Sequence, residues 1–373
     1  MTRVCYVIPS LSVGGTERQL VALLRGLVKD HELRVVCTRR GGALAGDVHR
    51  LGVDVRVLGA RSGWDFTMEN ALYRFLRAHP ADVVHSSLFG FDLFVNRAAR
   101  KAGVPVVISS RRQLATWKRW RHLFIQKRAN RLVDCIVANS RAVAEFAAEQ
   151  ERADPALFRV IYNGMNADEF VSTAELHQLR KRYRIPFHRR VIGLVANFAP
   201  VKDHPLFVAT ARALVTRRAD VHFLTVGTGP DAHKIDRMVA HRDLSDCFTR
   251  LSTLAELPDL YRLMDVSVLC SKVEGFPNAV IESMAAGVPV VAAAVGGIPE
   301  IIQHEKTGRL VNTRAPEDFA REIAWVLDHP DESDAMARRA AQFVRSELTL
   351  DRMADNYRAL YDELLAEARQ KGR

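Results

Sequence analysis

The chain is 373 residues long, with 48% hydrophobic and 26% charged residues and a formal net charge of +11 at pH 7. This composition is typical of a soluble globular protein, and the length is too great for one ordinary core but suits two domains. Because no run of about 18 apolar residues occurs, the sequence predicts no membrane-spanning helix.

The first segment and the cysteines both indicate a cytoplasmic protein. Residues 4–9 have the pattern of a first β-strand and lack the basic start and long apolar core of a signal peptide, so we expect the chain to remain in the cytoplasm. The five cysteines are scattered singly, without a CxxC pair, which favours buried thiols over a disulfide framework or a zinc site.

Short apolar runs alternate with helical patterns along the chain, which predicts βαβ units and parallel sheets. Two such series appear, separated by a polar segment at 176–190 that we interpret as a linker. The predicted fold class is therefore α/β, with Rossmann-like domains at 1–185 and 186–349 that face a cleft. The expected strands are 4–9, 33–37, 53–58, 83–85, 106–109, 135–138 and 160–162 in the first series, and 191–196, 222–226, 266–270, 288–294 and 309–311 in the second.

Ligands of open α/β sheets bind at the carboxyl ends of the strands, so polar residues that directly follow a predicted strand are site candidates. In the first domain, Gly14 and Gly15 follow the first strand and leave room for a phosphate to approach the backbone at a helix start. His85 closes the fourth strand and fits a packed strand-end histidine nearly as well as a functional one. Arg111 and Arg112 follow the fifth strand and suit an acceptor that carries a phosphate or pyrophosphate.

The segment from Arg111 to Arg131 concentrates positive charge on a short helical pattern. It contains eight basic residues and no acidic one, interleaved with aromatic residues such as Trp117 and Trp120. This mixture is typical of an interfacial surface, where each cation near anionic lipid contributes about 1 kcal/mol. We therefore expect contact with the inner face of an anionic membrane or with an anionic acceptor. A merely solvated face is the alternative, and nucleic acid ranks lower because no nucleic-acid motif accompanies the run.

Two loops of the second domain also follow predicted strands, and a third candidate pair lies before a predicted helix. Asn197 and Lys202 follow its first strand, where Lys202 would stabilise charge that develops on a departing phosphate. Gly229 lies in a G-x-G-x-x-A pattern after the second strand, which is the wrong strand for a dinucleotide-binding fingerprint. The pair Arg250 and Leu251 directly precedes a helix-like segment.

The most informative stretch runs from Glu274 to Glu282 (EGFPNAVIE) and continues through Gly287 into an apolar strand. Pro277 suits a first helical position and Gly287 is a stop signal, which predicts a helix over 277–286. The free N–H groups and positive dipole end of a helix start attract anions, while here a carboxylate lies on either side of it. This combination suits a ligand with both phosphate and hydroxyl groups, as sugar nucleotides have.

This stretch resembles the signature of the retaining, GT-B-fold glycosyltransferases of family 4, which contains two glutamates separated by seven residues. Gly275, Gly287 and the turn Gly296-Gly297 fit the same pattern and make the resemblance specific. The resemblance implies the GT-B fold, and it implies that the C-terminal segment at 350–373 crosses back to pack on the first domain.

The resemblance also implies roles for individual residues. Glu274 would contact the transferred sugar and Glu282 the ribose, while Lys202 would hold the diphosphate. Asn197 departs from the family, which has an arginine near this position, so the diphosphate clamp is either weaker or completed by another cation. The implied donor-binding residues are Gly14, Gly15, Asn197, Gly229, Arg250, Leu251, Gly275, Phe276, Pro277, Asn278 and Glu282, and the acceptor-binding candidates are His85, Arg111 and Arg112.

The sequence therefore predicts a retaining hexosyltransferase that uses a UDP-sugar or GDP-sugar and a lipid-linked or glycan acceptor, in polysaccharide or glycoconjugate biosynthesis. Because DxD and HExxH motifs are absent, we expect neither a metal nor another cofactor. Two alternatives stay open. A sugar-nucleotide epimerase of the same fold would need cleft acids and bases, and a non-catalytic nucleotide- or glycan-binding protein would lose clamp residues, as the departure at Asn197 hints.

Overall fold

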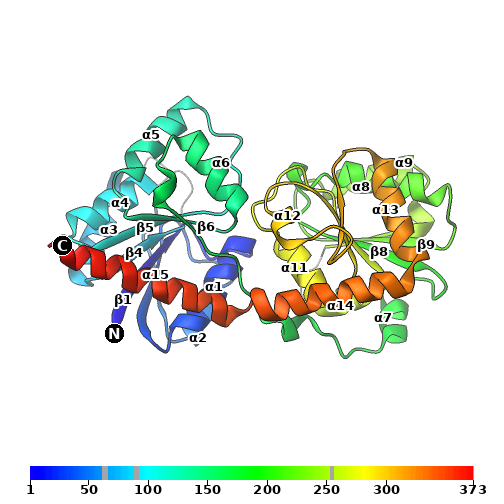
Figure 1. The fold of residues 1–373 in the computed structure, drawn as a ribbon, viewed down its shortest axis with the longest axis horizontal. Coiled ribbons are helices and arrows are strands. Elements are labelled where there is room, and N and C mark those ends of the chain that lie inside the picture. The colour runs from blue at the N-terminus through cyan, green and yellow to red at the C-terminus, as the bar shows by residue number, and fades with distance from the viewer. Residues whose placement is uncertain (61–65, 88–91, 253–255, 373) are drawn as a thin grey trace. The chain divides into compact units, whose positions relative to one another are not determined.

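The computed structural model describes residues 1–60, 66–87, 92–252 and 256–372. The chain divides into two compact units, of which unit 1 comprises residues 1–165 with 350–373 and unit 2 comprises residues 166–349 (Figure 1). The boundary falls between Met165 and Asn166, so the segment expected as a linker lies inside unit 2.

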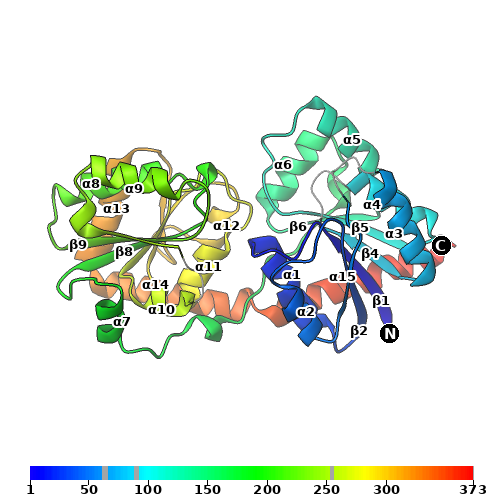
Figure 2. The same ribbon diagram turned by 180° about the vertical axis from the view of Figure 1, so that it is seen from behind.

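Unit 1 is a parallel α/β sheet with helices on both faces, which Figure 2 shows from behind. Its strand order among the described residues is β3-β2-β1-β4-β5-β6-β7. The strands are β1 (Thr2–Ile8), β2 (His31–Cys37), β3 (Asp54–Val57), β4 (Val83–Ser86), β5 (Val106–Arg111), β6 (Cys135–Ala138) and β7 (Phe158–Val160). The helices are α1 (Gly15–Leu27), α2 (Ala45–Arg50), α3 (Phe66–Ala78), α4 (Asp92–Lys101), α5 (Trp120–Asn130), α6 (Arg141–Glu151) and α15 (Leu350–Gln370), with a 3-10 turn η1 (Pro155–Leu157).

Two apolar clusters hold unit 1 together, one on each face of its sheet. On one face, α1 and the C-terminal helix α15 pack on β1 and β2 through residues such as Leu24 and Leu360. On the other, α3 and α4 pack on the same sheet through residues such as Leu72 and Val95. Side chains that alternate along the strands supply both clusters, which is why these strands are apolar throughout.

Unit 2 repeats the same design with the described strand order β10-β9-β8-β11-β12-β13. Its strands are β8 (Arg190–Val195), β9 (Val221–Val226), β10 (Phe248–Leu251), β11 (Val266–Leu269), β12 (Val290–Ala293) and β13 (Arg309–Val311). Its helices are α7 (Leu176–Arg182), α8 (His204–Val215), α9 (Ala232–His241), α10 (Leu257–Arg262), α11 (Asn278–Ala285), α12 (Ile298–Ile301), α13 (Pro316–Asp328) and α14 (Pro330–Glu347), with 3-10 turns η2 (Ala167–Phe170), η3 (Pro200–Lys202) and η4 (Ser245–Cys247).

Both sheets reverse their strand order at one point, and this point locates the site. The reversal lies between β1 and β4 in unit 1 and between β8 and β11 in unit 2. Such switch points leave a crevice at the carboxyl ends of the strands, where ligands of doubly wound sheets bind. The α/β class and the parallel sheets predicted from the sequence are confirmed. The edge strand β10 was not predicted, and β7 lies two residues before its expected start.

The predictions for the cysteines and for hydropathy can be compared directly with the structure. All five cysteines are buried and free, as the sequence predicts. Burial raises the pKa of the Cys37 thiol to about 11, so this thiol stays protonated at neutral pH. Among the described residues, no helix is long and apolar enough to cross a membrane.

Candidate functional site

The loops that follow β8 and β11 meet at the switch point of unit 2 and bring two predicted residues together. Lys202 ends the 3-10 turn η3 after β8, and Glu274 lies in the loop after β11. The Nζ of Lys202 donates to Oε1 of Glu274 at 2.5 Å, and the hydroxyl of Ser271 donates to the same oxygen at 2.5 Å. The carboxylate is largely buried, with 9% of its side chain exposed, whereas the lysine side chain is 23% exposed.

The second glutamate lies inside the helix that follows. Helix α11 begins at Asn278, directly after the buried Pro277, and Glu282 is one turn further along. The hydroxyl of Tyr261, from α10, donates to Oε2 of Glu282 at 2.9 Å. Glu282 is 8% exposed, so this contact fixes a nearly buried carboxylate. The two glutamates thus lie at different positions of one loop–helix segment, as the signature predicts.

The residues between Glu274 and the helix are packed rather than free. Gly275, Phe276 and Pro277 are all buried. The N–H of Gly297, in the loop after β12, donates to the Glu274 carbonyl at 3.4 Å. The Glu274 loop is therefore tied to the neighbouring loop of the sheet, which restricts where its carboxylate can move.

Glycines after β9 allow the backbone to pass close to the loop after β8. A Cβ on Gly229 would lie 2.5 Å from the carbonyl oxygen of Phe198, and the φ of Gly229 is +151°. A Cβ on Gly227 would lie 2.0 Å from the carbonyl oxygen of Ala196. Both positions therefore require glycine for packing. Asn197, beside them, is exposed.

Arg250 and Leu251 lie on the edge strand β10. The guanidinium of Arg250 donates to both carboxylate oxygens of Asp236, at 2.6 and 2.9 Å, and this hydrogen bonding raises the pKa of Arg250. It also lies over the Phe198 ring, 5.7 Å from its centroid. The Leu251 carbonyl accepts from the N–H of Gly227 at 3.0 Å. The Arg250 side chain is thus held by contacts within unit 2.

In unit 1, the glycine pair lies where the sequence predicts it. Gly14 precedes α1, which begins at Gly15, and both follow β1 at the switch point of the sheet. The first turn of α1 contains Glu17, whose carboxyl has its pKa raised by burial.

His85 lies inside a buried hydrogen-bond network. Its Nδ1 lies 3.0 Å from the hydroxyl of Tyr361 on α15, and its Nε2 lies 2.7 Å from the Ser110 hydroxyl. Burial and, to a smaller extent, the charge of Arg112 together lower the pKa of His85 to about 3. Arg112 itself donates to Oδ1 of Asn163 at 2.9 Å and to the Tyr357 hydroxyl at 3.2 Å. His85 is therefore a neutral, packed side chain in this structure.

Arg111 has a different environment from the one we expected. Its guanidinium is buried and donates to Glu151, Asp92 and Asn130 and to the Ser110 carbonyl, so all five N–H donors are used. Burial alone would raise the pKa of Glu151, but the ion pairs with Arg111 and Lys118 hold it at about 2. No donor of Arg111 is left for an acceptor phosphate, so it is corrected to a structural residue, and only Arg112 stays a candidate.

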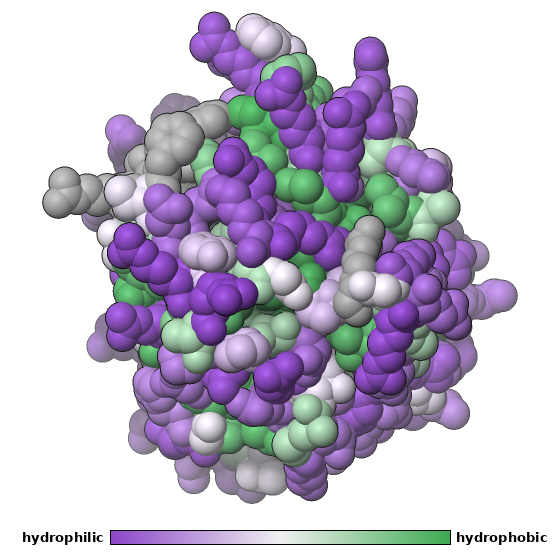
Figure 3. Space-filling model, turned by 90° about the vertical axis from the view of Figure 1, so that its left-hand side faces the viewer, coloured by the Kyte–Doolittle hydropathy of each residue, from purple (hydrophilic) through white to green (hydrophobic). Residues whose placement is uncertain are grey.

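The basic segment keeps only part of its expected surface. Lys118 donates to Oε1 of Glu151 at 2.6 Å, and 4% of its side chain is exposed, so it is corrected from a surface cation to a buried ion-pair partner. The exposed cations of the segment are Arg119, Arg121, Lys127, Arg128 and Arg131. Figure 3 shows hydrophilic side chains that project around apolar ones at the upper end of unit 1, at the height of α5 in Figure 1. The exposed aromatic residues are Trp117 (52%), Trp120 (72%) and Phe124 (54%).

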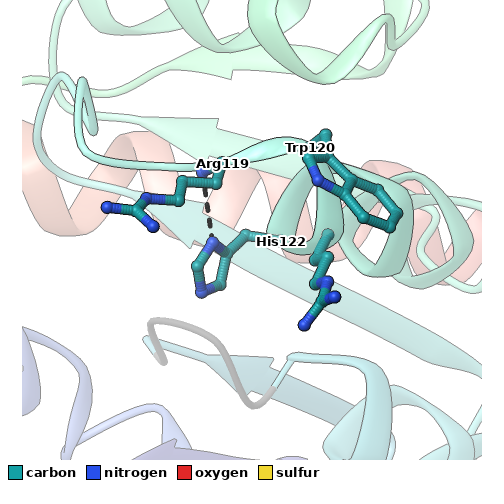
Figure 4. Close-up of a pocket in the computed structure, with 4 residues that line it drawn as sticks. Arg119, Trp120 and His122 are labelled. Carbon is teal, nitrogen blue, oxygen red and sulfur yellow. Dashed lines mark hydrogen bonds between the residues drawn. The ribbon is translucent and has the colours of Figure 1, made fainter.

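A hollow of about 540 Å³ opens at the first turn of α5. Figure 4 shows the side chains of Arg119, Trp120 and His122 spreading out from this turn. The backbone N–H of Arg119 donates to Nδ1 of His122 at 3.1 Å, which fixes the orientation of the imidazole. Arg121 completes the lining, so cationic side chains and one indole surround the opening.

Two residues of unit 2 were missed by the sequence analysis although each follows a strand. Ser271 comes after β11 and bonds Glu274, and Arg314 comes after β13 and contacts the same loop. The carboxyl-end rule that selected Lys202 would have selected both. Tyr261 was also missed, and its place inside a short helix offers no such signal.

Two doubly wound units, one with a lysine and two glutamates at its carboxyl edge, place the chain in the class of two-domain α/β proteins with ligand sites at their switch points. Comparison with protein families defines the class further. The family described as "Glycosyl transferases group 1" matches residues 177–343, and the family described as "Glycosyltransferase Family 4" matches residues 13–169. The chain belongs to glycosyltransferase family 4, as its EGFPNAVIE stretch predicts.

Known relatives support this assignment. D-inositol 3-phosphate glycosyltransferase of Mycobacteroides abscessus is 32% identical over 240 residues, which cover 61% of this chain and 53% of the relative. N-acetyl-alpha-D-glucosaminyl L-malate synthase of Bacillus anthracis is 29% identical over 191 residues, which cover 51% of this chain and 50% of the relative. The chain thus spans about half the length of the curated relatives it matches.

A solved structure confirms the fold. HepE of Anabaena, in complex with UDP-glucose, matches with a TM-score of 0.87 over 98% of this chain and 100% of HepE, at 18% identity. The GT-B fold predicted from the sequence is therefore confirmed.

Proposed function

We propose that this protein transfers a hexose from a nucleotide diphosphate sugar to an acceptor with retention of configuration. One observation carries the proposal: Lys202 and Glu274 meet at the switch point of unit 2, with Glu282 one turn inside the adjacent helix. A cation for phosphate and two carboxylates for hydroxyl groups are the contacts that a sugar nucleotide needs.

Each of the three residues has a distinct role in this proposal. Lys202 stabilises the negative charge that develops on the departing diphosphate. Glu274 accepts hydrogen bonds from the sugar hydroxyls, and Glu282 accepts them from the ribose. In the transfer, the acceptor oxygen bonds to the anomeric carbon on the face that the diphosphate leaves. The bond from that carbon to the phosphate oxygen breaks, and the acceptor proton passes to the departing diphosphate.

The donor that we propose is a UDP-sugar, with a GDP-sugar as the alternative. The solved relative HepE was crystallised with UDP-glucose, which supports this choice. Thermal unfolding with UDP, GDP and ADP decides between the nucleotides, because a ligand at 100 times its dissociation constant adds about 2.7 kcal/mol of stability.

Turnover with a panel of UDP- and GDP-hexoses tests the reaction itself. Release of free nucleoside diphosphate together with a glycosylated product supports transfer, and the product's anomeric configuration, measured by NMR, should match the donor's. Isomerised donor would instead identify an epimerase, and binding without turnover would identify a binding protein. An inverted product would contradict the retaining reaction.

For the acceptor we propose a molecule that carries an anionic group, lipid-linked or on a growing glycan. Arg112 of unit 1 supports this, because it is a partly exposed cation directly after β5, at the carboxyl edge of the sheet. The names of two relatives contain L-malate and inositol 3-phosphate, both of which are anionic. Competition of the transfer reaction by phosphate-containing and neutral acceptors distinguishes an anionic acceptor from a neutral one.

We further propose that α5 contacts an anionic membrane. Its exposed cations lie beside exposed rings, since the guanidinium of Arg128 is 4.3 Å from the Phe124 ring centroid and that of Arg121 is 5.2 Å from the Trp120 centroid. Aromatic rings at headgroup depth together with cations near anionic lipid favour peripheral binding.

Vesicle binding tests the α5 surface. The wild type should sediment with vesicles that contain phosphatidylglycerol at low salt and release at about 0.5 M salt, because exposed charges are screened over about 10 Å already at 0.1 M. Reversal of Arg119, Arg121 and Arg128 to glutamate should abolish binding. The control reverses Lys29, Arg50 and Arg56, which change the charge equally elsewhere in unit 1 and should preserve binding. Equal loss in both variants would indicate non-specific charge attraction instead of a surface on α5.

A further inference from the structure

Arg314 joins three loops at the carboxyl edge of the unit 2 sheet. It lies in the loop after β13, and its Nη1 donates to the Ser271 carbonyl at 2.9 Å while its Nη2 donates to the Cys270 carbonyl at 2.6 Å. The same Nη2 also pairs with the carboxylate of Asp203, in the loop after β8. One side chain thus connects the loops that follow β8, β11 and β13.

Arg314 contacts neither Lys202 nor Glu274 in these bonds, but it contacts one neighbour of each. On the β11 side it holds the backbone of Ser271, whose hydroxyl donates to Glu274 at 2.5 Å. On the β8 side it pairs with Asp203, the neighbour of Lys202. The backbone N–H of Lys272 also donates to the Val201 carbonyl at 2.8 Å, and this bond joins the same two loops, after β11 and after β8.

The charge of Arg314 also has an effect of its own. The Asp203 side chain is 13% exposed and stands next to the lysine that we assign to the diphosphate. An unpaired carboxylate there would repel a diphosphate. Arg314 contacts the carboxylate directly and is its nearer counter-ion, while Nζ of Lys272 lies 4.0 Å from the same oxygen. Asp203 has a φ of +51°, a backbone conformation that aspartate and asparagine adopt more readily than most residues. An Asp203→Asn variant can therefore remove the charge without straining the loop.

Arginine suits this position better than lysine. A guanidinium presents its donors in a rigid planar fork and can bond two carbonyls and a carboxylate together, whereas an ammonium is a single point charge on a flexible chain.

We infer that Arg314 is a positioning residue for the transfer reaction, with two separable effects. It holds the Ser271 segment so that Glu274 stays aligned, and it neutralises Asp203 so that the diphosphate can approach Lys202. This inference rests on the proposed function.

The first experiment measures loop order without reference to activity. Amide hydrogen exchange of residues 270–276 is compared in the wild type, in Arg314→Ala and in the matched control Arg218→Ala. Arg218 also bonds two carboxylates, those of Asp220 and Asp328, but Asp220 directly precedes β9 at the opposite edge of the sheet. Exchange in 270–276 should be at least tenfold faster in Arg314→Ala and unchanged in the control.

The second experiment separates the two effects by kinetics. In Arg314→Ala, kcat should fall about tenfold and KM for the donor should rise about fivefold. Adding Asp203→Asn should return KM to within twofold of the wild type and leave kcat low. Arg314→Lys should recover part of KM, because it restores charge, and little of kcat, because it cannot bond both carbonyls.

The outcomes decide the inference and the proposed function separately. Unchanged exchange in Arg314→Ala, or kcat within twofold of the wild type, would overturn the positioning role. A KM that Asp203→Asn fails to restore would overturn the neutralising role. If the wild type turns over no donor, the proposed function fails, and hydrogen exchange still decides whether Arg314 holds the Glu274 segment.

Discussion

The substitution Glu274→Gln has an unusual expected outcome, because Glu274 and Lys202 neutralise each other in this structure. Their charged atoms are 2.5 Å apart, and the carboxylate side chain is 9% exposed. A diphosphate can use the full charge of Lys202 only after the lysine leaves the carboxylate. Glutamine keeps the shape and removes the competing charge. We therefore expect turnover to fall while nucleotide binding becomes tighter.

The size of the effect follows from the geometry. At 2.5 Å the Coulomb attraction is about 1.7 kcal/mol in water and about 7 kcal/mol at an effective dielectric constant of 20. Desolvation of two partly buried ions offsets most of this attraction, and an exposed pair contributes only about 0.2–1 kcal/mol. A net value of about 1 kcal/mol corresponds to UDP binding about fivefold tighter in Glu274→Gln. Turnover should fall by about 10²-fold or more, because the contact of the carboxylate with the sugar strengthens in the transition state.

Calorimetric titration with UDP and product formation by chromatography measure the two effects. The matched control is Glu322→Gln, which removes a partly buried carboxylate paired with Arg309 at the amino end of β13 and should change neither value. UDP binding that weakens fivefold or more in Glu274→Gln would refute the competition between carboxylate and diphosphate. Turnover within threefold of the wild type would refute a role for Glu274 in the reaction.

Three further predictions address the other residues. Glu282→Ala should weaken UDP binding by about 1–3 kcal/mol in calorimetric titration, and unchanged affinity in a folded variant would remove Glu282 from the site. Lys202→Ala should lower turnover by about 10²-fold or more, while the wild type should keep its rate in EDTA; activity that EDTA abolishes and magnesium restores would contradict this. Because burial lowers the pKa of His85 to about 3 from 6.5, the unfolded chain takes up a proton as the pH falls below 6.5 and the folded chain does not, so stability is lost. At pH 5.5 the loss at His85 is about 1.3 kcal/mol relative to pH 7, and urea unfolding of His85→Gln at both pH values should show a dependence smaller by this amount.

The sequence predicted the strands and the signature residues because both depend on local patterns. A strand in a doubly wound sheet is buried on both faces, so it appears as an apolar run, and the residues directly after it reach the carboxyl edge. Lys202 and Glu274 follow β8 and β11, and the structure brings them together as this rule implies. The edge strand β10 (FTRL) escaped prediction because it is half-exposed and short, and therefore lacks a continuous apolar run.

Arg111 and Arg112 show that a local sequence pattern does not reveal which side chain is buried and which long-range partner it has. We expected the fifth strand to end at Ser109, which places both arginines in a loop. The strand continues through Arg111, and successive side chains of a strand point to opposite faces. Arg111 therefore enters the interior and Arg112 points the other way. One partner of Arg111 is Glu151, 40 residues later, and no spacing within the segment signals this contact.

The ion pairs of Arg111 and Lys118 reduce the positive charge that the segment 111–131 presents to solvent. Asp92 and Glu151 lie outside the run of basic residues, yet their carboxylates are bonded to Arg111, and Glu151 is bonded to Lys118 as well. A buried carboxylate without such partners would cost far more than the pairs contribute, so these two cations serve stability. The charge available to a membrane is therefore the set on the exposed face of α5 and the turn before it. These cations lie beside the exposed aromatic rings, so that both kinds of side chain can contact one membrane interface. A vesicle assay that reverses Lys118 would confound unfolding with lost binding, whereas one that reverses Arg119, Arg121 and Arg128 addresses the surface alone.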